Sequence, residues 1–196
     1  KPPMAEKLAS LEHLAPHFHL SLQSGSDRVL AAMKRKYNSA MAMRAIELLR
    51  EKIPNVKFTT DVIVGFPGET EEDFEATAEF LRKARFLRVH LFPYSKRAGT
   101  PAATMKGQIS KEEKSRRLHI LSEIEKDIRK QMLEEEIISL PVKQVLFETY
   151  RDGVATGHTP DFLEVKVLTT RPLPPCGEIT VTPLSREGEI LICEMI

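Results

Sequence analysis

Strand-like and helix-like segments alternate along the first half of the chain. Residues 17–22 and 89–93 are short apolar-rich runs, and residues 58–64 are β-branched and apolar, the composition of a strand buried on both faces. Between these runs, apolar residues recur every three or four positions, which is the spacing of a helix that packs on one side. We expect helices over residues 5–14, 27–36, 40–52 and 70–85.

Two capping signals mark the expected starts of helices. Thr70 with Asp73 fits a capping box, and Ser110 with Glu113 fits a second one. The second box opens a long charged helix that carries an apolar stripe and ends near Glu136. We interpret this helix as a packing and connecting element whose charges form a solvated face.

The order strand, helix, strand, helix, strand predicts an α/β fold with a parallel sheet and helical crossovers. In such sheets, ligands bind at the carboxyl ends of the strands. The candidate site is therefore composed of three loops, residues 23–27, 65–69 and 94–100.

The pattern changes beyond the long helix. From residue 137 onward helical spacing disappears, and short β-rich runs are divided by Asp-Gly, Pro and Gly signals. The runs are residues 142–150, 153–156, 162–168, 178–183 and 189–193. Five short strands predict a small all-β barrel, a class that often binds oligonucleotides. We therefore expect two domains, residues 1–136 and residues 137–196.

Composition restricts the class of protein. With 41% hydrophobic and 29% charged residues, the chain has the make-up of a folded globular protein. No apolar run approaches the ~18 residues of a membrane span, so we expect a cytoplasmic protein that binds no membrane. The net charge of +1 gives no indication of a nucleic-acid partner. Residues 137–196 hold five basic and eight acidic residues.

Only two cysteines occur, Cys176 and Cys193, and their spacing matches no common zinc or iron-sulfur pattern. We interpret them as free thiols of a reducing compartment. The six histidines are scattered along the sequence, so no metal site is predicted. The chain opens on Lys1 rather than on methionine, and we expect it to be a piece of a longer protein.

The loop after residues 58–64 has two interpretations. Gly65 and Gly68 permit a tight turn and the close approach of a ligand, and the following helix offers free backbone N–H groups to an anion. The same residues also describe a well-capped turn with no ligand. Asp61 sharpens the question, because a carboxylate in an apolar strand is costly unless it is paired or meets a ligand hydroxyl or ammonium in a cavity.

The other two loops are polar. Residues 23–27 (QSGSD) lead from a strand into a helix, with Ser26 or Asp27 as the expected N-cap. Lys96 and Arg97 stand together after the third strand, an arrangement that suits a phosphate or carboxylate and equally suits an exposed loop.

Three stretches taken together resemble a known family. They are residues 19–37 (HLSLQSGSDRVLAAMKRKY), 61–74 (DVIVGFPGETEEDF) and 90–103 (HLFPYSKRAGTPAA). In this order and at this separation they resemble the carboxyl-terminal half of the radical-SAM methylthiotransferases. Residues 145–148 (VLFE) and 157–165 (GHTPDFLEV) are similar to the TRAM domain that closes those enzymes.

The resemblance implies the carboxyl-terminal part of a partial (β/α) radical-SAM barrel, followed by a small OB-like TRAM barrel. It also implies S-adenosylmethionine as cofactor, an electron donor, and two [4Fe-4S] clusters in the full-length protein. The family's cluster cysteines have no counterpart in this sequence. The chain alone is therefore expected to be inactive.

The resemblance further implies which residues contact the cofactor. Residues 61–69 match the family's GxIxGxxE stretch, which packs against adenine, although Asp61 replaces its first glycine. Polar residues of the 23–27 loop would meet the ribose and methionine portions, and Phe92 would add an adenine contact. The implied cofactor-binding residues are Gln23, Ser24, Ser26, Asp61, Ile63, Gly65, Glu69 and Phe92.

By the same resemblance, Lys96 and Arg97 would face the substrate, and the terminal barrel would hold RNA. The candidate RNA contacts in the barrel are Tyr150, Arg151, His158, Phe162, Lys166 and Arg171. The basic members would meet phosphates, and the aromatic ones would stack on bases. The alternative is that these residues are ordinary barrel-core and turn positions, in keeping with the acidic balance of residues 137–196.

Within the family, residues 90–103 are most similar to the branch that adds a methylthio group to C2 of threonylcarbamoyladenosine beside the tRNA anticodon. The isopentenyladenosine branch is the second possibility, and the branch that modifies a ribosomal-protein aspartate is the third. A non-catalytic RNA-binding protein that reuses the fold is a competing hypothesis from a different class.

Overall fold

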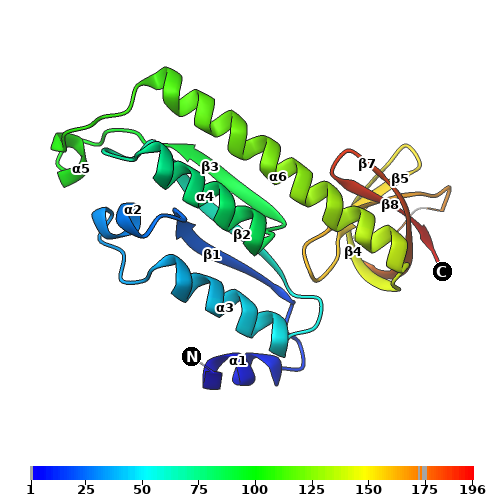
Figure 1. Cartoon of the computed structure of the whole chain (residues 1–196). Coiled ribbons are helices and arrows are strands. Elements are labelled where there is room, and N and C mark those ends of the chain that lie inside the picture. Colours follow the sequence, from blue (N-terminus) through cyan, green and yellow to red (C-terminus); the bar gives the residue numbers. More distant parts are fainter. Residues whose placement is uncertain (1, 172, 174–175) are drawn as a thin grey trace.

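The computed structural model of the chain describes residues 2–171, 173 and 176–196. Lys1, on which the first expected domain begins, lies outside the described residues, as do three positions of the second. Figure 1 shows a three-stranded sheet with its helices at one end of the molecule and a β-barrel at the other, with a long helix running between them.

The three strands of the sheet are all parallel, in the order β1-β2-β3. They are β1 (His17–Gln23), β2 (Lys57–Val64) and β3 (Arg88–Pro93). In the central strand, Thr60 pairs with Leu20 on one side and with Val89 on the other. The predicted parallel sheet is confirmed, and its strands start and end within one residue of their expected positions.

Six helices accompany this sheet in the described part of the chain. They are α1 (Pro2–Ala9), α2 (Asp27–Ala32), α3 (Ser39–Lys52), α4 (Glu71–Ala84), α5 (Pro101–Thr104) and α6 (Lys111–Ser139). The predicted capping box of Thr70 and Asp73 is present. Ser110 also caps α6 through Glu113 N, but the Glu113 carboxylate pairs with Arg116 and Arg117 instead of completing a box.

Two helices are shorter than the sequence predicts. The first ends at Ala9 rather than at residue 14, where the Ser10 hydroxyl donates to the Lys7 carbonyl. The second ends at Ala32 rather than at residue 36, because Lys34 adopts a left-handed backbone with φ of 60°. That conformation ends an α-helix in the manner of a C-terminal cap.

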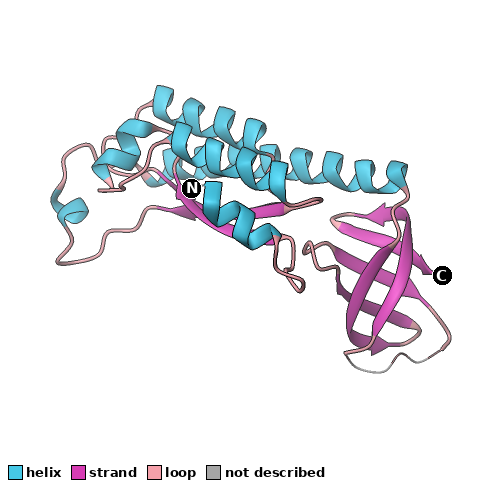
Figure 2. Ribbon diagram, turned by 90° about the horizontal axis from the view of Figure 1, so that it is seen from below, coloured by secondary structure: helices cyan, strands magenta, loops and turns pink. Residues whose placement is uncertain are grey.

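The expectation that the central strand is buried on both faces is wrong. Phe58, Val62 and Val64 are buried on the face that the helices cover. On the opposite face Thr59 is buried, whereas Asp61 and Ile63 are only half-buried. In Figure 2 the helices lie mainly on one side of the strands, so that β2 has one face buried under the helices and one face that is only partly covered.

Asp73 joins the amino-terminal ends of α2 and α4. Its carboxylate accepts hydrogen bonds from Ser26 Oγ at 2.6 Å and from Thr70 N at 2.8 Å, and it pairs with Arg28. Burial alone would raise the pKa of Asp73, but these hydrogen bonds outweigh it and hold the pKa well below its ordinary value. The 23–27 loop is therefore fixed to the start of α4.

The second half of the chain forms a closed barrel in the order β4-β5-β6-β8-β7. Its strands are β4 (Lys143–Arg151), β5 (Val154–His158), β6 (Glu164–Leu168), β7 (Glu178–Glu187) and β8 (Ile190–Met195). Val145, Val165 and Leu191 are fully buried in its core. The five predicted strands and the predicted small barrel are confirmed.

The long helix α6 contributes to two hydrophobic cores. Leu121 is buried in the core beneath the sheet, whereas Ile128, Met132 and Leu133 are buried in the core of the barrel. The predicted role of packing and connecting is confirmed, and Figure 2 shows the helix extending from the sheet to the barrel. The sequence predicts that the charges of this helix form a solvated face. That prediction is wrong for Arg117, which is 4% exposed.

Four charged side chains meet where the sheet, α6 and the barrel join. Lys57 Nζ lies 2.7 Å from Glu136 Oε1 and 3.4 Å from Asp161 Oδ2. Lys143 Nζ lies 2.9 Å from Glu136 Oε2 and 3.2 Å from Asp161 Oδ2. We call these four residues the ion quartet. Each cation faces both carboxylates, so two positive and two negative charges compensate one another in a poorly hydrated place.

We predict that Asp161→Asn lowers the free energy of unfolding by about 3 kcal/mol at pH 7, because it leaves two lysines with one carboxylate in a buried site. Burial acts to raise the pKa of Asp161, but Lys143 and Lys57 outweigh it and depress the pKa below its ordinary value. The stabilisation is therefore present at neutral pH and is lost as pH falls below about 4. Urea unfolding of both proteins from pH 7 to pH 3 measures this convergence.

Glu79→Gln is the matched control, because Glu79 pairs with Lys83 on the exposed face of α4. Its removal should change the free energy of unfolding by less than about 1 kcal/mol. Equal losses for the two variants, or a loss for Asp161→Asn that does not shrink in acid, would contradict the role given to the ion quartet.

Candidate functional site

The carboxyl ends of the three parallel strands border a pocket of about 560 Å³. It is lined by Gln23, Asp61, Ile63, Phe92, Pro93, Tyr94, Ser95, Arg97, Thr100 and Ala102. Every one of the three strands contributes, and the loop after β3 closes one side. The position agrees with the general rule for ligand sites in parallel sheets.

Five residues predicted from the sequence come together in this pocket: Gln23, Asp61, Ile63, Phe92 and Arg97. Ile63 and Phe92 are paired neighbours on adjacent strands and supply an apolar floor. Phe92 is 49% exposed, an unusual state for a large aromatic side chain. Asp61 and Arg97 add one charge of each sign, so the pocket can meet a flat apolar ring and polar groups together.

Beside the pocket lies an unsatisfied polar atom. The hydroxyl of Tyr94 is buried and has no hydrogen-bond partner among the residues that the structure describes. The Tyr94 ring is held in place by Phe66, at 5.4 Å between ring centroids, and by the ammonium of Lys114, at 5.3 Å from its centroid. An unpaired buried hydroxyl is costly, and its burial keeps it out of reach of a ligand in the pocket.

Two predicted contacts of the 23–27 loop point into the protein. Ser24 Oγ lies 3.2 Å from Thr77 Oγ1, and Ser26 caps α2 and donates to Asp73. Between them, Gly25 lies so close to α4 that an added Cβ would stand 2.7 Å from Thr77 Cα. Of this loop, only Gln23 lines the pocket. Its φ of 70° at the end of β1 marks the strained turn that brings it there.

Gly65 and Glu69 form a support behind the pocket. The Glu69 carboxylate accepts a hydrogen bond from Gly65 N at 2.7 Å and pairs with Arg117 at 2.7 Å. Gly65 has a φ of +73°, and an added Cβ there would collide with the Lys114 side chain. These contacts fix the turn after β2, and neither Gly65 nor Glu69 lines the pocket.

The sequence interpretation missed the contribution of α6 to this support. Lys114 Nζ donates to the Tyr94 carbonyl at 2.9 Å, and Arg117 neutralises Glu69. Both residues lie in the helix whose charges looked solvated. For Arg117 the available signal was Glu113 one turn earlier, but that spacing is equally common on exposed helices, and Lys114 follows no acidic residue at that spacing.

The predicted substrate-side cations are separated. Arg97 lines the pocket, whereas Lys96 is exposed and does not line it. The Arg97 carbonyl accepts bonds from Thr100 N and Oγ1, which fold the loop back before α5. Arg97 is thus available to a ligand in the pocket, whereas Lys96 is available to a group at the protein surface beside it.

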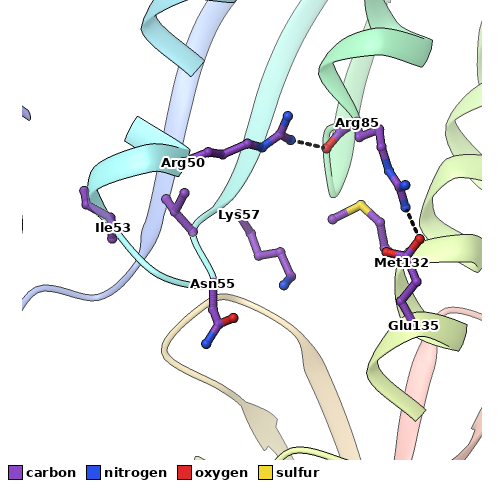
Figure 3. Close-up of a pocket in the computed structure, with 8 residues that line it drawn as sticks. Arg50, Ile53, Asn55, Lys57, Arg85, Met132 and Glu135 are labelled. Carbon is purple, nitrogen blue, oxygen red and sulfur yellow. Dashed lines mark hydrogen bonds and ion pairs between the residues drawn. The ribbon is translucent and has the colours of Figure 1, made fainter. Parts of the chain in front are cut away.

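A second cavity, of about 290 Å³, lies near the opposite ends of the strands (Figure 3). Its lining contains more basic residues than that of the first pocket, but these residues already have partners within the protein. The guanidinium of Arg50 donates to the carbonyls of Ala84 and Arg85 at the end of α4, and Arg85 pairs with Glu135 at 2.7 Å. These contacts cap α4 and hold α6 against it, so the cavity is best explained as packing.

Five of the six barrel residues predicted to bind RNA lie at the two ends of the barrel. Tyr150, Arg151 and Arg171 lie at one end, where Tyr150 Oη donates to the Thr169 carbonyl at 3.3 Å. His158 and Phe162 lie at the other end, where the Phe162 ring stacks on His17 of β1 at 4.4 Å.

Lys166 lies between these two ends, in the middle of β6, and pairs with Glu187 at 2.7 Å. Among these contacts, the one that reaches the sheet is made by Phe162, and Tyr150, Arg151 and Arg171 make none. Phe162 instead helps to join the barrel to β1, since its ring is shared by His17 and His158.

The chain supplies no thiol ligands near the pocket. Its two cysteines both lie in the barrel segment, where Cys176 is exposed and Cys193 is buried. Burial raises the pKa of the Cys193 thiol to about 11, so it stays protonated at neutral pH. The pocket therefore fits an organic ligand, and the donor set does not fit an iron-sulfur cluster. No helix of the described residues is long and apolar enough to cross a membrane.

The chain is similar to known proteins. A profile of the radical SAM superfamily matches residues 1–81. The threonylcarbamoyladenosine tRNA methylthiotransferase of Thermotoga maritima is 41% identical over 185 residues, and that of Bacillus subtilis is 36% identical over 186 residues. These matches cover 90% and 93% of this chain, and 40% and 41% of the relatives.

The tRNA-2-methylthio-N(6)-dimethylallyladenosine synthase of Carboxydothermus hydrogenoformans is 50% identical over 123 residues, which are 63% of this chain and 28% of that enzyme. The chain thus spans less than half the length of the curated relatives it matches. The relatives include both kinds of tRNA methylthiotransferase.

Among solved structures, coproporphyrinogen III oxidase of Escherichia coli, described as a radical SAM enzyme, matches with a TM-score of 0.52 at 13% identity. The match covers 95% of this chain and 44% of that one, and it supports the fold alone. The superfamily profile and the tRNA methylthiotransferase relatives confirm the family resemblance seen in the sequence: the chain belongs to the radical-SAM methylthiotransferase family.

Proposed function

We propose that the chain is part of a tRNA methylthiotransferase that modifies threonylcarbamoyladenosine, and that it supplies one wall of the S-adenosylmethionine site and an RNA-holding barrel. The choice of substrate is supported by how much of the chain aligns with each kind of relative. Alignments with the two threonylcarbamoyladenosine enzymes run through the sheet and the barrel, over 90% or more of the chain. The dimethylallyladenosine enzyme of Carboxydothermus matches at higher identity but over 63%, and is the alternative.

The pocket at the strand ends suits S-adenosylmethionine chemically. Phe92 and Ile63 offer an apolar surface for adenine, and Asp61 suits a ribose hydroxyl or the ammonium of the methionine portion. The Gln23 side chain adds a polar partner. Ser24, Ser26, Gly65 and Glu69 support this wall from behind, through the hydrogen bonds that fix its loops.

The barrel is proposed to be an OB-like TRAM module that contacts tRNA mainly at its Tyr150 end. Arg151 and Arg171 are exposed there, beside an aromatic side chain on which a base can stack. The overall acidic balance of residues 137–196 makes this local group the expected source of phosphate contacts.

The rest of the chemistry is proposed to lie outside this chain. The two [4Fe-4S] clusters need cysteine ligands that the sequence does not contain, and an electron donor must reduce them. The chain alone is therefore proposed to bind without catalysing methylthio transfer. We place its action in the cytoplasm, where tRNA and S-adenosylmethionine are both available.

For the cofactor wall, we predict that S-adenosylmethionine shifts the backbone amide resonances of Gln23, Ile63 and Phe92 when it is titrated into the chain. Phe92→Ala should weaken the fitted affinity about tenfold, because an exposed aromatic surface that covers adenine contributes on the order of 1.5 kcal/mol. NMR titration of the isotope-labelled chain measures both effects.

Leu168→Ala provides the control for that titration, since Leu168 is an exposed apolar residue of the barrel. Its affinity for S-adenosylmethionine should equal that of the unaltered chain. Shifts confined to the barrel, or the same affinity for Phe92→Ala, would remove the pocket from the cofactor site.

For the substrate, we predict that a Thermotoga maritima enzyme carrying this chain in place of its own matching segment still modifies threonylcarbamoyladenosine. In the Thermotoga maritima enzyme, the segment that aligns with this chain is replaced by residues of this chain, and the modified nucleosides of tRNA are measured by mass spectrometry. Methylthio transfer to threonylcarbamoyladenosine is expected. The same replacement in the Carboxydothermus enzyme is the comparison, and activity only in that second chimera would favour dimethylallyladenosine instead.

For the barrel, we predict that the chain binds unmodified tRNA with an affinity that falls as salt rises. Arg171→Ala should weaken binding and reduce the slope of log affinity against log salt by about 0.7 to 0.9, because one phosphate contact is lost. Fluorescence anisotropy between low and moderate salt measures the slope. Lys83→Ala, an exposed cation of α4, should leave it unchanged. Salt-independent binding would argue against phosphate contacts by the barrel.

A further inference from the structure

Three ligand-type side chains converge on the partly covered face of the sheet, one from each strand. They are His19 of β1, Asp61 of β2 and His90 of β3. Asp61 and His90 are direct partners in the parallel pairing of their strands. One ligand atom from each of the three residues lies within 4.8 Å of the others, although the residues are far apart in the sequence.

The distance between the first two groups is that of metal ligands. His19 Nε2 lies 3.3 Å from Asp61 Oδ2. Two ligand atoms that each stand 2.0–2.1 Å from a tetrahedral zinc ion are themselves about 3.3 Å apart. The His90 ring lies 6.0 Å from the His19 ring between centroids, and one of its nitrogens lies within 4.8 Å of the ligand atoms of His19 and Asp61.

A buried hydroxyl orients the first histidine. Thr59 Oγ1 lies 3.0 Å from His19 Nδ1, and Thr59 is 2% exposed, so its position is fixed by the strand. This hydrogen bond leaves Nε2 of His19 directed to Asp61. Metal-binding histidines characteristically use one ring nitrogen for the metal and bond the other to a neighbouring polar group.

The charge balance also favours a cation here. Two imidazole rings and one carboxylate together offer three ligand atoms and one negative charge, a set that suits a divalent ion. Two histidines and a carboxylate make a three-ligand set that leaves a fourth position open, as in catalytic zinc sites.

We infer that His19, Asp61 and His90 form a binding site for a divalent transition-metal ion, with Zn²⁺ as the expected ion. The fourth position is left for water or for a group of a ligand in the adjoining pocket, which Asp61 also lines. The site shares Asp61 with the proposed cofactor wall, but metal binding is a property of this chain alone and can be tested apart from that proposal.

The test is a titration of the untagged 196-residue chain with Co²⁺, followed by competition with Zn²⁺. We expect one equivalent of Co²⁺ to bind with the intense visible absorption of a four-coordinate site, and Zn²⁺ to abolish that absorption. His19→Ala and His90→Ala should each weaken Co²⁺ binding at least tenfold. Circular dichroism and thermal unfolding of each variant verify that the fold is retained.

Two matched controls keep the outcome specific. His119→Ala removes an exposed histidine of α6 and should bind Co²⁺ as the unaltered chain does. Cys176→Ser removes the exposed thiol, and should also leave binding unchanged. Binding that is lost with Cys176, or binding that survives in both His19→Ala and His90→Ala, would overturn the inference.

Thr59→Val tests the orienting hydrogen bond separately. It replaces the hydroxyl with a methyl group of similar shape and should lower the Co²⁺ affinity about 10- to 100-fold, the usual cost of losing such a partner. S-adenosylmethionine titration of His90→Ala then separates the two sites, because that variant should lose the metal and keep the cofactor shifts. An unchanged Co²⁺ affinity for Thr59→Val, or no Co²⁺ binding by the unaltered chain, would contradict the site.

Discussion

The parallel pairing of β1, β2 and β3 is the constraint on which the candidate sites depend. Because parallel strands end at the same edge, Gln23, Ile63 and Phe92 reach one pocket although long helices separate them in the sequence. The same register places a row of polar side chains one step lower on the same face. Helices cover the other face, so the chemistry and the hydrophobic core occupy opposite sides of one thin sheet.

The helix α6 and the ion quartet determine how the two halves of the chain meet. The helix is long enough to enter both hydrophobic cores, and at its end Glu136 shares two lysines with Asp161. Apolar burial supplies a non-directional attraction, whereas the quartet has one favourable arrangement. The stack of Phe162 on His17 adds a third contact across the same junction.

Membership of the radical-SAM methylthiotransferase family gives the pocket a chemical context, and the structure adds roles that the motifs do not express. Motif residues divide into those that face the pocket, such as Asp61, and those that hold its loops, such as Glu69 with Arg117. A motif records both kinds alike, because losing either disturbs the same site. Their separation follows from burial and hydrogen-bond partners.

The sequence by itself determined the order of strands and helices, the capping of α4, the small barrel and the family, because these depend on local spacing and on contiguous motifs. It also located the edge of the sheet that borders the pocket, since parallel topology dictates where strands end. Of the three expected loops, parts of the 94–100 loop and Gln23 line the pocket, whereas residues 65–69 support it from behind. Only the tertiary structure decided which face of β2 is covered, that Ser24 and Ser26 point inward, and that His19, Asp61 and His90 meet. These are contacts between residues distant in the chain, which local patterns cannot encode.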